Sequence, residues 1–245
     1  MEHKNGLGQP IGAPVPTWTE RRKPPRTAVR GHYASVEPLD PKARGQELFD
    51  SAAEDKEGHM WTYMFHGPFV SREAYVGWMY LTAMGDDPQF YSIVDLANGK
   101  AVGMASFMRI DPKGGALEVG GISIAPRGQR SRVATEAMFL MMKRAFDELA
   151  YRRYEWKCDA LNAPSRTAAE RLGFSYEGIF RQATMYKGRN RDTAWYAIID
   201  KEWPFLKSAF ETWLKPENFD ADGRQKARLS TLTAEALKAA KAPVA

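Results

Sequence analysis

One segment near the middle of the chain constrains the fold most: an apolar strand runs into an arginine-rich turn and then into a long helix. The strand covers Leu117–Ile124, and the turn that follows reads Ala-Pro-Arg-Gly-Gln-Arg-Ser. The helix is predicted over Arg132–Leu149, because apolar side chains recur there at helical spacing. A helix start presents backbone N–H groups without partners in the helix, and the helix dipole makes this end positive. The turn therefore favours a phosphate or pyrophosphate group.

Two interpretations of this turn stay open on the residues alone. Arg127, Arg130 and Arg132 add positive charge, while Gly128 and Ser131 keep the turn small and rich in hydrogen-bond donors. The segment lacks the GxxxxGK[ST] spacing of a P-loop. Basic turns are also common on solvated surfaces, so an anion site and an ordinary exposed turn both fit.

The order of the other segments predicts a mixed α/β sheet. Strands are expected over residues 32–39, 89–96, 101–110, 116–124, 153–160, 174–181, 183–186 and 193–200. Helices are expected over residues 41–54, 71–84, 132–149, 163–172, 201–213 and 221–240, with Ser71 as an N-cap. Asn98-Gly99 predicts a tight hairpin, and residues 187–192 an exposed turn. This order is not a repeated βαβ series, and it places helices on both faces of the sheet.

Composition favours a globular protein built around one large domain. The chain has 245 residues, 44% of them hydrophobic, and it contains no run of about 18 apolar residues that could span a membrane. The N-terminus lacks the apolar stretch of a secretory signal. Cys158 is the single cysteine of the sequence, which excludes an internal disulfide framework and a cysteine-built metal site. We therefore expect a cytoplasmic protein.

The net charge of +5 is concentrated at the N-terminus. Residues 1–31 contain six Lys or Arg, two Glu and five Pro, so we expect a basic Pro/Gly-rich arm there. The rest of the chain is nearly balanced, whereas a nucleic-acid binder would carry a basic face through its folded part. Binding of nucleic acid is therefore the least favoured function. Residues 32–214 are expected to form the main domain, and 215–245 a helical extension that serves as a dimer contact or a surface cap.

Two ordered motifs resemble those of the GNAT N-acetyltransferases, and more narrowly of their RimJ/RimL-like branch. Gln129-Arg-Ser-Arg-Val-Ala-Thr135 is similar to the family motif Q/R-x-x-G-x-G/A. Asn162-Ala-Pro-Ser165, followed by Arg171-Leu-Gly-Phe174, matches a second family segment. The resemblance spans about residues 30–205. It implies the GNAT fold, a mostly antiparallel twisted sheet with helices on both faces, and acetyl transfer from acetyl-CoA without a metal.

The resemblance also assigns residues to coenzyme A. In the family, the strand before the turn splays from its neighbour, pantetheine lies in the gap, and backbone N–H groups near Gly121–Ser123 would hold the thioester carbonyl. The implied contacts are Ile122, Ser123, Ile124, Gln129, Arg130, Ser131, Arg132, Val133, Ala134, Thr135 and Asn162. Arg132 stands where the family usually has glycine, and we expect its guanidinium to contact the pyrophosphate.

Glu118 and Ser165 are the catalytic candidates that the resemblance implies. Glu118 starts the strand that enters the turn, where the family commonly has a general base; a solvent-facing carboxylate is the alternative. Many relatives carry a tyrosine seven residues after the asparagine as the acid for the leaving thiolate, but here that position is Ala169. Ser165 would then supply the proton, unless it only bonds local backbone. Asn162 is a helix N-cap, a contact to coenzyme A, or both.

The acceptor pocket is expected near the first two helices. Aromatic residues gather in residues 61–80, where family analogy places the wall of the acceptor pocket, although core or interface packing explains them as well. His59 and His66 have no metal-ligand partner at sensible spacing. The acceptor is expected to be the primary amine of a protein N-terminus or of a small molecule. A non-catalytic acyl-CoA sensor is the alternative that Ala169 raises, and a homodimer is compatible with the sequence.

Overall fold

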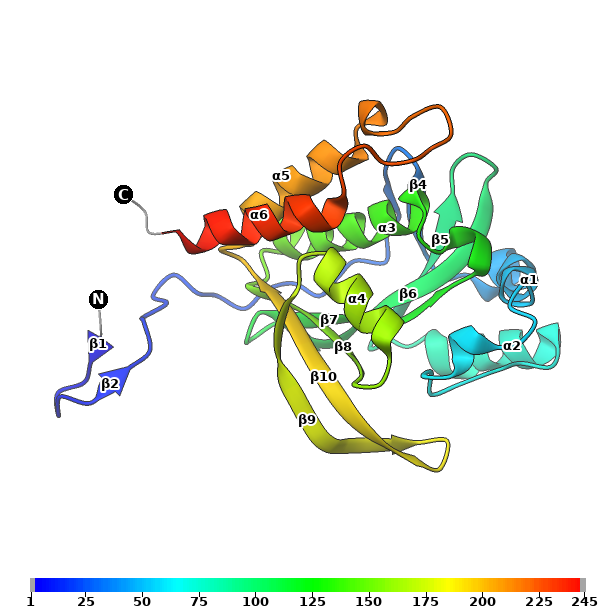
Figure 1. The fold of residues 1–245 in the computed structure, drawn as a ribbon. Helices are drawn as coiled ribbons and strands as arrows, with labels where there is room; N and C mark the ends of the chain where they lie inside the picture. The colour runs from blue at the N-terminus through cyan, green and yellow to red at the C-terminus, as the bar shows by residue number, and fades with distance from the viewer. Residues whose placement is uncertain (1–2, 243–245) are drawn as a thin grey trace.

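The computed structural model describes residues 3–242 and is organised around an eight-stranded sheet (Figure 1). Its strand order is β3-β4-β5-β6-β7-β8-β10-β9, and all neighbours are antiparallel except β7 and β8, which are parallel. The strands are β3 (Val29–Arg30), β4 (Ala34–Pro38), β5 (Gln89–Asp95), β6 (Lys100–Asp111), β7 (Ala116–Ile124), β8 (Arg153–Asp159), β9 (Ser175–Tyr186) and β10 (Arg189–Ile199). The mixed, mostly antiparallel sheet confirms the predicted fold class.

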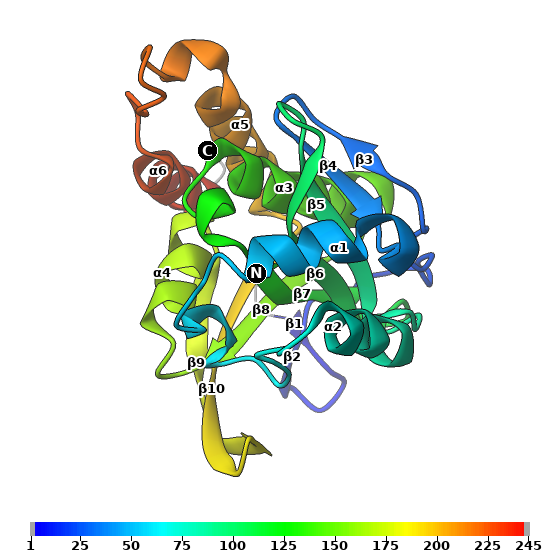
Figure 2. The same cartoon turned by 90° about the vertical axis from the view of Figure 1, so that its right-hand side faces the viewer.

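Helices cover both faces of the sheet (Figure 2). They are α1 (Pro41–Ala52), α2 (Arg72–Trp78), α3 (Arg132–Lys143), α4 (Ala163–Arg171), α5 (Trp203–Leu214) and α6 (Leu229–Lys241). One apolar core joins the sheet to α3 and α5, with Leu117 and Val119 of β7 pointing into it. A second core lies under α1 and α2 and includes Met104 of β6. Because side chains alternate along a strand, Glu118 points to the face of the sheet opposite Leu117 and Val119.

The helix starts follow from short polar side chains that cap them. The Asp40 carboxylate accepts hydrogen bonds from two backbone N–H groups at the start of α1, and Ser71 Oγ accepts from Ala74 N at 3.2 Å. The Ser71 cap is thereby confirmed. Both α2 and α3 continue into a π-helical turn, Met79–Ala83 and Arg144–Glu148 respectively, so the two long predicted helices are present over nearly their whole length.

Two predicted segments near the C-terminal end were wrong in their bounds. Residues 174–181 and 183–186 form one continuous strand, β9, which pairs with β10 through the two-residue turn Lys187-Gly188. Both turn residues have positive φ, 48° and 70°, as a tight hairpin turn requires. The last helix starts at Leu229 instead of residue 221, because a 3₁₀ turn and an irregular loop precede it and no side chain caps an earlier start.

The N-terminal arm touches the domain at several points, one of which is Trp18. Its first part, the small hairpin of β1 (His3–Lys4) and β2 (Pro10–Ile11), stands away from the sheet in Figure 1. Trp18 Nε1 donates to Lys113 O at 2.7 Å, and its ring lies against the backbone of Gly115. Ile11 and Val15 are about half exposed. The arm is therefore held by Trp18 at the turn between β6 and β7, and farther along by Arg26, which donates to Met84 O at 3.2 Å, and by β3 in the sheet.

Candidate active site

Strands β7 and β8 separate halfway along their length. They pair from Ala116 to Val119 on β7 and from Arg153 to Trp156 on β8, and their remaining residues have no ladder between them. A bulge lies at the same place, because Ala105 of β6 stands opposite two residues of β7. Gly121 has a φ of 59° within this bulge, a conformation that glycine adopts without strain. The β8-facing edge of residues 120–124, including Ile122, Ser123 and Ile124, is thus open to an extended partner.

The start of α3 lies at the end of this opening. Ser131 is its N-cap: Oγ accepts from Ala134 N at 3.1 Å and donates to Gly128 O at 2.6 Å. Gln129 Nε2 donates to Ile124 O at 2.9 Å, which ties the turn back onto β7. Within residues 3–242, no acceptor takes the N–H groups of Arg132 and Val133, so both remain available to an anion.

Two of the three arginines of the turn are engaged elsewhere. Arg127 forms an ion pair with Glu54 and also donates to Ala101 O at 2.9 Å. The Arg132 guanidinium lies between two rings, 4.8 Å from the centroid of Tyr33 and 4.7 Å from that of Phe219. Aromatic stacking thus directs this side chain toward the C-terminal segment, and the expected contact of its guanidinium with the pyrophosphate stays a prediction.

Arg130 and Arg171 are two arginines near the start of α3 that form no ion pair within the described residues. Arg130 is exposed, and Arg171 donates to Thr135 Oγ1 at 3.1 Å. Burial lowers the pKa of Arg171, and the nearby charge of Arg130 adds to this effect, so the two cations lie close enough to repel. In the described part of the chain neither has a carboxylate within 4.0 Å. Arg171 was not assigned from the sequence, although the second motif contains it.

Glu118 lies in a buried ionic network. One carboxylate oxygen is 2.7 Å from Arg109 Nη1 and 3.1 Å from Lys157 Nζ, and Lys157 also pairs with Glu155 at 2.7 Å. Burial raises the pKa of Glu118, and the two cations oppose that rise without cancelling it. Since only 3% of the side chain is exposed, the solvent-facing alternative for Glu118 is wrong.

Ser165 and Asn162 lie at the start of α4. Asn162 Oδ1 accepts from Ser165 N at 3.1 Å, which confirms the N-cap role. Ser165 Oγ accepts from the indole N–H of Trp156 at 3.0 Å, and its hydroxyl also interacts with the thiol of Cys158, whose pKa is raised by burial. The side chain therefore reaches β8 instead of bonding only local backbone. Ala169 is fully buried in the core, where it offers no proton.

The aromatic region between α1 and α2 packs against the open part of β7. The buried ring of Tyr75 contacts Trp61 and Phe69, and its hydroxyl interacts with Ser123. His66 stacks on Trp78 at 4.0 Å, and burial lowers its pKa to about 4, with Lys187 adding to the effect. These aromatic side chains therefore form a packed core, and Tyr75 at its edge lies next to the open part of β7. Lys187 Nζ donates to Trp61 O at 2.7 Å, which joins the β9–β10 hairpin to this region.

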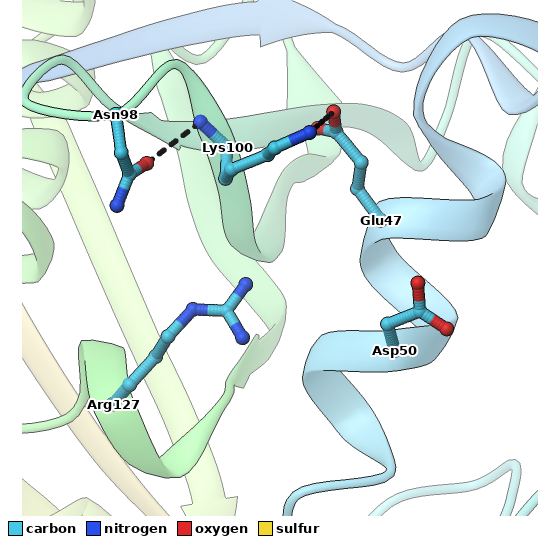
Figure 3. A pocket seen from close by; sticks show the side chains of 5 residues that line it. All are labelled: Glu47, Asp50, Asn98, Lys100 and Arg127. Atoms are coloured by element: carbon cyan, nitrogen blue, oxygen red, sulfur yellow. Dashed lines mark hydrogen bonds and ion pairs between the residues drawn. The ribbon is translucent and has the colours of Figure 1, made fainter.

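A cavity of about 380 Å³ lies outside this region, between α1 and the turn before α3 (Figure 3). Its charged lining residues are largely paired, since Lys100 bonds Glu47 at 3.4 Å and Arg127 pairs with Glu54. No cluster of three or more metal-ligating side chains occurs among residues 3–242. No helix in this part of the chain is both long and apolar enough to cross a bilayer.

Comparison with known proteins identifies the family to which this architecture corresponds. The family model for the acetyltransferase (GNAT) domain matches residues 38–175. A crystal structure of a GCN5-related N-acetyltransferase from Brucella melitensis superposes with a TM-score of 0.88 at 45% identity, covering 90% of this chain and 100% of that one. The Bacillus subtilis protein named "Putative ribosomal N-acetyltransferase YdaF" is 30% identical over 108 residues, 44% of this chain and 58% of that protein.

Proposed function

Because this chain belongs to the GNAT acetyltransferase family, we propose that it transfers an acetyl group directly from acetyl-CoA to a primary amine. The observation that carries the proposal is the opening between β7 and β8, which leads to the start of α3. An unpaired strand edge suits the amide groups of pantetheine, and a helix start suits its pyrophosphate. The amine belongs to a protein N-terminus or to a small molecule.

The residues around this opening divide into two roles toward coenzyme A. Ile122, Ser123 and Ile124 present the strand edge, while Gln129 and Ser131 fix the shape of the turn. Val133, Ala134 and Thr135 form the first turn of α3, and Arg132 contributes its backbone N–H. Arg130 and Arg171 supply positive charge that no protein carboxylate within 4.0 Å neutralises in the described residues. Asn162 holds the start of α4 near the thiol end.

The chemistry needs a base, a polarised carbonyl and an acid. Glu118 takes a proton from the attacking amine, directly or through water, and a raised pKa makes a carboxylate a better base near neutral pH. A backbone N–H of residues 121–123 polarises the carbonyl. The nitrogen–carbon bond forms and the carbon–sulfur bond breaks. Ser165 gives its proton to the leaving thiolate, while the N–H of Trp156 stabilises the serine oxygen. Water then returns a proton to the serine, and Glu118 releases its proton to water, so both side chains are restored.

Titration of coenzyme A into the protein and thiol release from acetyl-CoA test this proposal. Arg130→Ala and Arg171→Ala should each weaken coenzyme A binding about tenfold, the loss expected when one charge-assisted contact to a phosphate disappears. Arg72→Ala is the matched control, because that exposed arginine pairs with Glu73 on α2. Unchanged affinity in both variants would overturn the cofactor assignment.

Ala169 supports a second candidate, an acyl-CoA-binding module without turnover. Its side chain is buried in the core, so the acid that many relatives place there is missing. Such a module would bind coenzyme A with the same dependence on Arg130 and Arg171. It would release no thiol from acetyl-CoA with any member of a panel of amines, and this result would decide for it.

A further inference from the structure

Arg191 of β10 is a buried cation without an acidic partner. Only 9% of the residue is exposed. Its Nε donates to Thr193 Oγ1 at 3.2 Å, and its guanidinium lies 5.2 Å from the ring centroid of Phe65 and 5.9 Å from that of Tyr186. No carboxylate of residues 3–242 lies within 4.0 Å of it. A buried charge is costly unless an opposite charge meets it.

The acids beside Arg191 are bound by other groups. Asp159 accepts from the hydroxyl of Tyr186 at 2.9 Å and from Leu161 N at 2.8 Å. Asp192 accepts from Gln182 N at 2.8 Å and from the side-chain amide of Asn190 at 3.0 Å. Both carboxylates are thus held by neutral donors, and neither lies within 4.0 Å of the guanidinium. The charge of Arg191 stays open to a group from outside the protein.

Lys187 adds a second positive charge on the hairpin that contains Arg191. Its Nζ donates to the carbonyl oxygen of Trp61, a neutral group, and burial lowers its pKa. The same ammonium lowers the pKa of His66, so its field reaches the aromatic region. Phe65 completes the surroundings with an exposed ring 5.5 Å from that of Tyr186. Where the β9–β10 hairpin approaches the loop before α2 (Figure 1), it therefore brings Arg191 beside Phe65 and Tyr186 and brings Lys187 to Trp61.

Arg191 shares one face of the sheet with the proposed base. Lys157 pairs with Glu118 and lies 3.8 Å from the ring centroid of Trp195, which is opposite it on β10. Arg191 follows on the same face, four residues from Trp195 along β10, which corresponds to roughly 13 Å in an extended strand. The carboxylate of Glu118 is paired with Arg109 and Lys157, whereas among residues 3–242 the Arg191 guanidinium has no carboxylate within 4.0 Å.

We propose that Lys187 and Arg191 bind a carboxylate of the acceptor, so that the favoured substrate is a peptide whose N-terminal amine is followed by an acidic residue. The proposal rests on the proposed acetyl transfer. It adds an anion subsite about three to five residues from the amine, since an extended peptide advances about 3.3 Å per residue. Phe65 and Tyr186 place aromatic surface beside the Arg191 guanidinium, which strengthens its ionic contact with a carboxylate.

Three C-terminally amidated hexapeptides with a free N-terminal alanine, aspartate at position four, five or six and alanine elsewhere test the subsite. Each is matched with its asparagine counterpart. The best aspartate peptide should exceed its counterpart about tenfold in kcat/KM, the worth of one charge-assisted contact. Arg191→Met should abolish this ratio and leave the asparagine peptide within about twofold of the wild type. Arg189→Met, an exposed neighbour on the same hairpin, should preserve the ratio.

Calorimetric titration of the same peptides into the protein saturated with coenzyme A gives a readout that needs no turnover. Aspartate-dependent binding that is lost in Arg191→Met supports the subsite even where acetyl transfer fails, and failed thiol release then counts against the proposed function alone. Arg191→Lys is the second variant, for the case in which Arg191→Met does not fold. Because it keeps the positive charge, it should still prefer the aspartate peptide to the asparagine peptide. Equal binding of aspartate and asparagine peptides, or an unchanged preference in a folded Arg191→Met, would overturn the inference.

Discussion

The carboxylate of Glu118 lies 3.1 Å from the ammonium of Lys157, and both side chains are more than nine-tenths buried. The pair connects the two strands that separate just beyond it, since Glu118 is on β7 and Lys157 on β8. Arg109 closes the network from β6, with a side chain that is 59% exposed. A basic carboxylate is thus held at the point where the sheet opens, and its more exposed partner leaves a side from which an amine can approach.

Replacement of Glu118 by glutamine should lower kcat/KM about a hundredfold, the usual contribution of a positioned general base. The wild-type rate should rise with pH through the pKa of Glu118, because only the ionised form accepts a proton. Burial raises that pKa, so this limb should lie above the range of an exposed carboxylate. Glu118→Gln should lose the limb. Glu235→Gln, at an exposed position of α6, is the control and should keep the limb. A pH–rate profile that is the same in Glu118→Gln and the wild type would assign the base elsewhere.

Ser165→Ala should lower kcat about a hundredfold and leave the affinity for coenzyme A within about twofold. The serine would lose its proton-donating role, while the charges that hold the phosphates would stay in place. Trp156 would lose an acceptor, which should cost about 1 kcal/mol in the free energy of unfolding. Thr167→Ala, on an exposed position of the same helix, should change neither quantity. Steady-state kinetics and coenzyme A titration of both variants measure these two quantities. Wild-type turnover in Ser165→Ala would remove Ser165 from the mechanism.

Glu136→Gln should destabilise the fold by about 3 kcal/mol, because a buried carboxylate that accepts several hydrogen bonds is lost. Glu136 lies on α3 and accepts from the backbone N–H groups of His32, Tyr33 and Ala34 at 2.9, 2.6 and 2.7 Å. It therefore fixes the start of β4 to the helix. Urea unfolding measures the change, with the exposed Glu235→Gln as control. Equal stability of the Glu136→Gln variant and the wild type would show that these bonds are replaced by others.

Local patterns predicted the strands and most helices, because alternation and capping are written in neighbouring residues. Ser71 and Asn98-Gly99 are examples in which one short segment determines a helix start or a turn. The hairpin of β9 and β10 was divided wrongly because a bulge near Arg191 shifts the register, and a bulge follows from pairing with another strand. The start of α6 was placed too early because an alanine-rich segment without a side-chain cap has no local start signal.

The site could be predicted where one segment contains it. The strand, turn and helix of residues 117–135 were identified from sequence, and the start of α3 is where it was expected. The partners of Glu118 were not identified, because the approach of Lys157 depends on the parallel pairing of β7 with β8. In the sequence, the only indication of these partners was that Glu155 and Lys157 alternate along a strand, which places both side chains on one face. The charge of Arg171 was missed because its closeness to Arg130 is a tertiary contact.

The orientation of Arg132 could not be deduced from the turn, since its two aromatic partners come from distant parts of the chain. Arg132→Ala should leave the affinity for coenzyme A within about twofold, because the guanidinium lies between Tyr33 and Phe219 and only the backbone N–H faces the anion. The same variant should lose about 1–2 kcal/mol in the free energy of unfolding, from two cation–π contacts. Arg130→Ala should show the reverse, with weaker binding and unchanged stability. Calorimetric titration and urea unfolding of the two variants separate these effects. A tenfold loss of affinity in Arg132→Ala would mean that this guanidinium leaves its rings to meet the pyrophosphate when coenzyme A binds.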